Sequence, residues 1–258
     1  MTRTLFSLAL CFSVAGAALA EEFRFNPVAD TSIFANVGGG ASSWDDVSDA
    51  GSDSIWVSTT GGGIVRRGLV RFDLGTIPDG YRVVSATLTL YESRSRDDHD
   101  IGLHRLLAGW GEGGSNGGGV GTGAPAQAGD ATWRWRDYGV SEWSTRGGDF
   151  VTEASATLRV GAQNASYTWD SNPGLVADVQ GWLDDPTSSF GWMLIGREDD
   201  AQVAKRFDSL QSGVAGQRPL LVVQAMPVPE PASALLLALG GAGLAAAGSR
   251  RRAVALRR

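Results

Sequence analysis

The stretch DATWRWRDYGVSEW, residues 130–143, concentrates aromatic and cationic side chains in a way that suits ligand binding. The C–H faces of a sugar ring stack on an aromatic π system, while polar neighbours bind the sugar hydroxyls. Arginine adds bidentate contacts to carboxylates, which favours an anionic polysaccharide such as a polymer of uronic acids. The candidate ligand-binding residues are therefore Trp133, Arg134, Trp135, Arg136, Tyr138 and Trp143.

The backbone around these residues decides what they can bind. On a strand, Trp133 and Trp135 would share one face, and Arg134 and Arg136 the other. On an irregular loop, all four side chains could surround one ligand. A third interpretation is that the tryptophans cap one end of a β-sandwich while the arginines meet acidic loops.

Acidic clusters are a second lead to a binding site. WDDVSDAGSD, residues 44–53, holds several oxygen-bearing side chains at close spacing. Calcium takes six to eight oxygen ligands, although this segment lacks the EF-hand pattern. Solvated acidic loops of a surface protein are the alternative explanation, and no other cofactor is expected. The candidate calcium ligands are Asp45, Asp46, Asp49 and Asp53.

The sequence offers little for catalysis. The chain has two histidines, His99 and His104, and its only cysteine, Cys11, lies in an apolar run near the N-terminus. The two histidines have no zinc-site spacing. Carboxylates for glycoside hydrolysis come from distant positions, and no pattern here singles out an acid and a base. We expect a protein that is not an enzyme, with a polysaccharide hydrolase or lyase as an alternative.

Both ends of the chain carry segments of the kind that direct export. Residues 1–20 hold Arg3, then an apolar run, then small residues ending at Ala20, which is the order of a secretory signal peptide. Near the C-terminus, residues 232–248 are uncharged and mostly Ala, Leu and Gly, at the lower length limit for a transmembrane helix. The arginines that follow indicate the cytoplasmic side of the membrane.

The C-terminal segment resembles the PEP-CTERM sorting signal of Gram-negative bacteria. It has the Pro-Glu-Pro motif, the apolar helix and the arginine cluster in the same order. In that family a membrane protease, an exosortase, cuts near Pro-Glu-Pro. The resemblance implies a transient stay in the inner membrane, followed by transfer to the cell surface or extracellular matrix. The motif residues here are Pro229, Glu230, Pro231, Arg250, Arg251 and Arg252.

Charge excludes one class of partner. Apart from Arg3 and the five arginines of the tail, the chain holds 16 basic and 28 acidic residues, so the exported part carries a net charge of about −12. Such a body repels phosphates, and we therefore expect no nucleic acid partner. The charge suits a soluble surface protein.

The body of the chain has the sequence pattern of β structure. RVVSATLTLYES, residues 82–93, alternates between apolar and polar side chains. SNPGLVADVQGWLDDP, residues 171–186, predicts one helix, with Asn172 as its cap and Pro173 in its first turn. The glycine-rich residues 109–129 are expected to form a mobile loop. The tryptophans expected in the core are Trp56, Trp182 and Trp192.

Many strands, one short helix and no internal repeat predict an all-β fold, an antiparallel two-sheet sandwich of the jelly-roll kind. ADTSIFA, WGEG, DATW and AKRFDSLQ stand in the order found in DNRLRE domains, which the body resembles. Those domains are similar to a family of carbohydrate-binding modules, so the resemblance implies polysaccharide binding. One departure is Leu210-Gln211, where the family usually has Arg-Glu.

The sequence therefore predicts three parts. A signal peptide spans residues 1–20, a DNRLRE-like sandwich 21–225, and a PEP-CTERM sorting signal with a transmembrane helix 226–258. The expected function is that of an exported surface or matrix protein that binds extracellular polysaccharide and is processed by an exosortase. The alternative is a structural matrix protein without a glycan site.

Overall fold

The computed structural model describes residues 19–38, 40–161, 163–199 and 202–228. Most of the predicted signal peptide and the helix predicted at 232–248 lie outside these ranges. Within the described ranges, no helix has the length and apolar character needed to cross a membrane. The helices of this part are α1 (Pro173–Asp184) and the short 3-10 helices η1 (Ser43–Asp46), η2 (Pro186–Ser188) and η3 (Ala215–Gln217).

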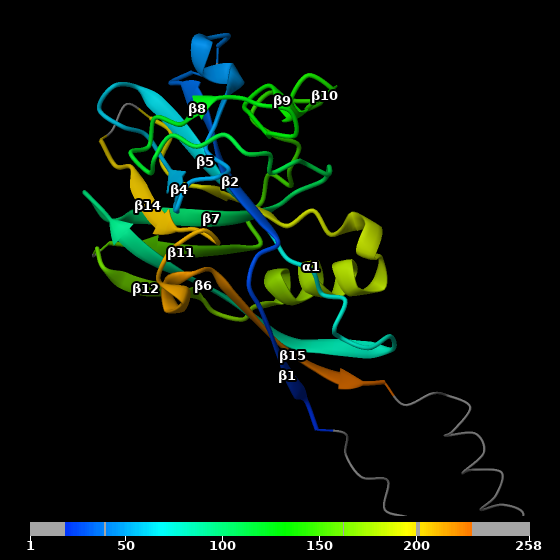
Figure 1. Cartoon of the computed structure of the whole chain (residues 1–258). Helices are drawn as coiled ribbons and strands as arrows, with labels where there is room; N and C mark the ends of the chain where they lie inside the picture. Colours follow the sequence, from blue (N-terminus) through cyan, green and yellow to red (C-terminus); the bar gives the residue numbers. More distant parts are fainter. Residues whose placement is uncertain (1–18, 39, 162, 200–201, 229–258) are drawn as a thin grey trace, which may run out of the picture.

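Two antiparallel sheets form a sandwich, as predicted (Figure 1). The first sheet contains β1 (Glu21–Phe25), β4 (Ser54–Val57), β6 (Tyr81–Arg94), β12 (Ala165–Trp169), β14 (Lys205–Asp208) and β15 (Leu220–Pro227). Its order is β1-β15-β6-β14-β4, and β12 also pairs with β6.

The second sheet has seven strands and packs against the first across the main core. It contains β2 (Ala29–Asn36), β3 (Val47–Ser48), β5 (Ile64–Arg71), β7 (His99–Arg105), β8 (Ala124–Pro125), β11 (Ala156–Val160) and β13 (Trp192–Ile195). Its order is β11-β7-β13-β5-β2-β3-β8. A separate small pair is formed by β9 (Trp135–Asp137) and β10 (Ser141–Glu142).

The main core fills the space between the sheets. On β6, Ala86, Leu88 and Leu90 are fully buried, and the residues between them are partly exposed, as a period of two requires. Trp182 and Trp192 are also buried, which confirms their predicted place in the core. Their ring centroids lie 4.5 Å apart.

The helix α1 begins and ends where the sequence predicts. The Asn172 side chain accepts hydrogen bonds from the backbone N–H groups of Gly174 and Leu175, at 2.8 and 3.2 Å. These bonds satisfy donors that a helix start leaves free. Leu175, Val179 and Trp182 form the buried stripe that packs the helix onto the core.

A second hydrophobic cluster lies on the other face of the seven-stranded sheet. In β13, Trp192 and Leu194 belong to the main core while Met193 belongs to this second cluster, so the two clusters lie on opposite faces. The cluster is completed by Trp110 and Trp133, which lie in the long segment 106–155. Both faces of this sheet are therefore covered, and β2 is buried along nearly its whole length.

The glycine-rich residues 109–129, expected to form a mobile loop, have defined backbone contacts with buried carboxylates. Asp49 Oδ1 accepts a hydrogen bond from the Gly117 N–H at 2.7 Å. The fully buried Asp130 accepts hydrogen bonds from the N–H groups of Ser115 at 3.3 Å and Gln127 at 2.6 Å. These side chains satisfy backbone donors in a segment that has few apolar residues to bury.

A buried arginine holds the same segment from the other side. Arg66 donates from Nε to the Gly121 carbonyl at 2.6 Å, and also from Nη2 to the same oxygen. Its guanidinium lies 5.7 Å from the ring centroid of Phe34 and 5.6 Å from that of Trp56. Gly121 thereby comes so close to Trp56 that an added Cβ would lie 2.8 Å from Cδ2 of the indole.

We predict that Gly121→Ala lowers the free energy of unfolding by about 1 kcal/mol or more beyond the loss in Gly118→Ala, because only the first overpacks a neighbour. Gly118 is the matched control: its φ of +74° resembles the +79° of Gly121, but an added Cβ there meets nothing within 4 Å. Urea unfolding of both variants measures the difference. Equal losses of unfolding free energy in the two variants would show that the close approach to Trp56 does not restrict the residue at position 121.

Candidate functional site

A tight turn at Thr132 separates the two tryptophans that the sequence predicts as sugar-binding. The Thr132 N–H donates to the Trp135 carbonyl at 2.7 Å. Thr132 Oγ1 accepts hydrogen bonds from the N–H groups of Arg134 and Trp135, at 3.2 and 3.0 Å. Because the chain turns within these four residues, Trp133 and Trp135 do not lie side by side.

Trp133 and Trp143 belong to the second hydrophobic cluster. They are 4% and 5% exposed. The Arg67 guanidinium lies 4.4 Å from the ring centroid of Trp133, and Trp143 Nε1 donates to the Thr132 carbonyl at 2.9 Å. These two rings are buried next to the turn and have no free face for a ligand.

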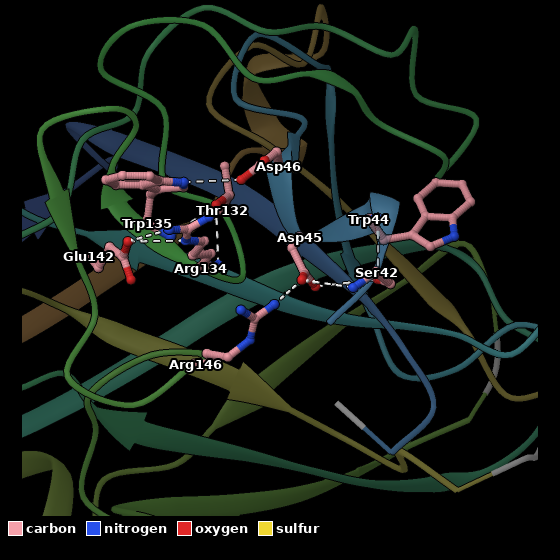
Figure 2. Close-up of polar contacts among 9 residues, drawn as sticks. All are labelled: Ser42, Trp44, Asp45, Asp46, Thr132, Arg134, Trp135, Glu142 and Arg146. Carbon is pink, nitrogen blue, oxygen red and sulfur yellow. Dashed lines mark hydrogen bonds and ion pairs between the residues drawn. The ribbon is translucent and has the colours of Figure 1, made fainter. Parts of the chain in front are cut away.

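Trp135 is the tryptophan of this stretch that keeps a partly exposed ring (Figure 2). Its Nε1 donates to Asp46 Oδ1 at 3.0 Å, which fixes the plane of the indole. The Arg134 guanidinium lies 4.8 Å from the ring centroid, and Tyr138 meets the indole edge-to-face at 6.0 Å. We call Trp135, Tyr138 and Arg134 the Trp135 platform.

The arginines of this stretch are already engaged. Arg134 donates to Glu142 Oε1 from Nη2 at 2.6 Å and from Nε at 3.1 Å, and this contact raises its pKa. Arg136 Nη1 donates to the Gly109 carbonyl at 3.0 Å. With Glu142 and Asp46 beside the ring, the platform carries no excess of positive charge.

Two of the candidate calcium ligands are used by the loops around η1. Asp45 accepts hydrogen bonds from Ser42 in a capping box, and it forms an ion pair with Arg146 (Figure 2). Asp46 is the acceptor for Trp135. Both carboxylates therefore have structural partners.

The other two candidates lie further along the chain. Asp49 is buried and holds Gly117, and burial raises its pKa, with the hydrogen bond from Gly117 acting in the opposite direction. Asp53 is exposed. Within the described ranges, no three His, Cys, Asp or Glu side chains are grouped so that they could hold a metal ion. Calcium binding stays a prediction.

Three segments that are far apart in the sequence meet at Asp30. Its Oδ2 accepts from the Leu210 N–H at 2.7 Å, and its own N–H donates to Glu112 Oε1 at 3.1 Å. Gln211 Nε2 donates to the same Glu112 oxygen at 3.1 Å. Leu210-Gln211, where the sequence departs from the DNRLRE pattern, thus forms a junction inside this protein.

A cavity of about 200 Å³ opens beside Trp56, which the sequence predicts only as a core residue. Trp56 and Arg94 are both register partners of Arg206, so β4, β14 and β6 bring them together. Arg94 is the last residue of β6 and Arg96 lies two residues beyond it, so the sequence signal for this site is a pair of closely spaced arginines after a strand. The lining residues are Trp56, Thr60, Gly61, Arg94, Arg96, Val120, Gln202 and Ala204.

A larger cavity of about 480 Å³ lies beside α1 and is partly apolar. Phe72, Trp182 and Phe190 contribute to its lining, with Asp73 and Asp79 as acidic members. This cavity therefore differs in charge from the one beside Trp56.

Comparison with protein families matches residues 227–252 to the PEP-CTERM protein-sorting motif. The predicted sorting signal is confirmed, and with it export to the cell surface or extracellular matrix of a Gram-negative bacterium and processing by an exosortase. The resemblance of the body to DNRLRE domains stays a prediction, and no curated protein matches the chain. The predicted motif residues lie outside the described ranges: Pro229, Glu230, Pro231, Arg250, Arg251 and Arg252.

The start of the matched segment belongs to the folded domain. Pro227 ends β15, and the Val228 N–H donates to the Gly80 carbonyl at 2.9 Å. The sorting motif thus begins directly at the end of a strand of the six-stranded sheet.

We predict that Asp30→Asn raises the free energy of unfolding at pH 8 and that the gain narrows toward pH 5. Burial raises the pKa of Asp30 to about 8, opposed by the Leu210 hydrogen bond and assisted by Glu112. An aspartate in the unfolded chain ionises near pH 4. Between these values the folded state holds an extra proton, so its stability falls as the pH rises.

Urea unfolding at pH 5, 6, 7 and 8 measures this difference. An asparagine oxygen still accepts from Leu210, so the hydrogen bond is kept. Asp79→Asn, at an exposed position, is the control. Burial also raises the pKa of Glu92, to about 7, but this effect is common to all three proteins and cancels in the comparison. Parallel pH profiles for wild type and Asp30→Asn would contradict the prediction.

Proposed function

We propose that this exported protein binds extracellular polysaccharide at the Trp135 platform, without catalysing its breakdown. The observation that carries the proposal is the partly exposed indole of Trp135, with its N–H bound to Asp46 and Tyr138 against its edge. An aromatic face suits the C–H face of a sugar ring. The exposed carboxylates of Asp46 and Glu142 lie where sugar hydroxyls need acceptors.

The fixed geometry of the platform favours binding. Asp46 holds the indole, and Glu142 holds the Arg134 side chain that covers it. Because these side chains are ordered by contacts within the protein, less conformational entropy is lost when a ligand binds. Since Arg134 is paired with Glu142, the platform is suited to neutral sugar residues.

The position of the platform also fits a surface protein. In Figure 1, η1, β9 and β10 lie at the top of the domain, while the start of β1 and the end of β15 lie at the bottom. The sorting motif follows β15 directly. The platform therefore lies at the end of the domain opposite the residues that lead into the sorting motif, where processing of that motif leaves it accessible.

We predict that Trp135→Ala weakens polysaccharide binding by roughly 30-fold, since removing an aromatic anchor costs about 2 kcal/mol or more. A polysaccharide array identifies the bound polymer, and affinity electrophoresis then compares the variants. Trp44→Ala is the matched control, because Trp44 is also partly exposed and lies on η1 but points away from the platform (Figure 2).

Three results would count against the proposal. Equal loss in Trp44→Ala and Trp135→Ala would remove the platform as the site. Absence of binding to every polymer on the array would favour a structural matrix protein. Release of shorter products from any polymer would favour a hydrolase or lyase.

We predict that replacing Pro229-Glu230-Pro231 by three alanines blocks processing. The protein would then keep its C-terminal segment and stay in the membrane fraction, since the motif that marks the cleavage region is gone. Mass spectrometry and fractionation of the producing bacterium measure this. A control with Pro27→Ala, outside the motif, should be processed as the wild type is, and unchanged processing of the triple variant would refute the assignment.

A further inference from the structure

The cavity beside Trp56 gathers cations on a protein that is acidic as a whole. The chain has a net charge of −6, and its exported part is more acidic still. Yet Arg94 and Arg96 line this cavity, and no Asp or Glu is among its lining residues. A positive site on an acidic surface selects for an anionic group, because the rest of the surface repels it.

The guanidinium groups of this cavity are not neutralised. Within the described ranges, the Arg94 guanidinium has no hydrogen bond or ion pair, and it lies 5.9 Å from the ring centroid of Trp56. Arg96 Nη1 donates to Gln202 Oε1 at 2.8 Å, which is a neutral acceptor. By contrast, Arg134 of the Trp135 platform is paired with a carboxylate.

The other walls of the cavity suit a sugar. The indole of Trp56 is the aromatic wall, and its N–H is buried with no acceptor in the described part of the chain. Trp56 is 3% exposed, so it offers the cavity an edge of its ring and not its N–H. Thr60 and Gln202 add polar groups. Gly61 leaves the space for Gln202, since an added Cβ there would lie 2.5 Å from its Cδ.

We propose that this cavity binds the carboxylate of an acidic sugar residue, with Arg94 and Arg96 as the anion-binding groups. The proposal rests on polysaccharide binding as the function, and it assigns recognition of acidic sugars to a site separate from the Trp135 platform. The volume of about 200 Å³ matches the charged end of one sugar residue, with the rest of the polymer outside. Arginine suits this task because its planar fork binds both carboxylate oxygens.

The test uses trigalacturonate, a short oligomer of an acidic sugar, and its methyl ester, in which the charge is removed. Titration calorimetry with the exported protein compares wild type, Arg94→Gln and Arg82→Gln. Arg82 is the matched control: it is exposed and lies on the same strand, β6, but does not line the cavity. Thermal unfolding of each variant checks that the fold is kept.

We expect Arg94→Gln to bind trigalacturonate about tenfold more weakly than wild type, and Arg82→Gln within twofold, since a hydrogen bond to a charged group is lost only in the first. The methyl ester should bind wild type at least tenfold more weakly than the acid. Trp135→Ala should leave binding of trigalacturonate within twofold.

Equal losses in Arg94→Gln and Arg82→Gln would reduce the binding to general electrostatic attraction and overturn the proposal. Equal binding of the acid and its ester, or no binding of the acid to wild type, would overturn it too. Loss in Trp135→Ala alone would move acidic sugars to the platform. Failure of this proposal would not count against sugar binding at the Trp135 platform, since that site is tested with its own polymer and variants.

Discussion

The buried guanidinium of Arg66 is the interaction on which both proposed binding regions depend. Burial lowers its pKa to about 10, opposed by the charge of Asp49, and it remains a cation that must be satisfied inside the protein. It is satisfied by the Gly121 carbonyl and by two aromatic rings. The glycine-rich segment is thereby held over Trp56, the wall of the cavity, and the same segment leads on to Asp130 and the turn at Thr132.

The covered outer face of the seven-stranded sheet explains how irregular segments can position a site. Loops usually carry function while a rigid scaffold positions them. Here the scaffold is extended, because Trp110, Trp133 and Trp143 anchor the long segment 106–155 on the sheet. Trp135 can then project from a short turn and still have a fixed orientation. In this stretch, Trp133 and Trp143 pack on the sheet, while Trp135 stays partly exposed.

Local features could be predicted from the sequence, and features that depend on distant residues could not. The cap at Asn172 and the alternation of β6 are set by neighbours in the chain. The structure confirms the cap, and it confirms the alternation from Ala86 to Leu90. Val84, which the pattern places on the buried face with Ala86, is exposed, and Val83 is buried in its place. The sorting motif is also a local pattern. The sequence alone does not decide the exposure of Trp133 and Trp135, because the side chain of Thr132 forms a turn that periodicity does not reveal. The cavity beside Trp56 needs three strands, whose pairing no short stretch of sequence specifies.

The place of β15 in the first sheet sets the order in which the fold can be completed. Within the described ranges, β15 is the last strand along the chain, yet it lies between β1 and β6, and β1 pairs with no other strand there. Synthesis proceeds from the N-terminus, so β1 has to be made long before β15, the strand with which it pairs. The six-stranded sheet is complete only when the residues directly before the sorting motif have been made and exported. A chain cut short before β15 therefore lacks both the complete sheet and the sorting motif.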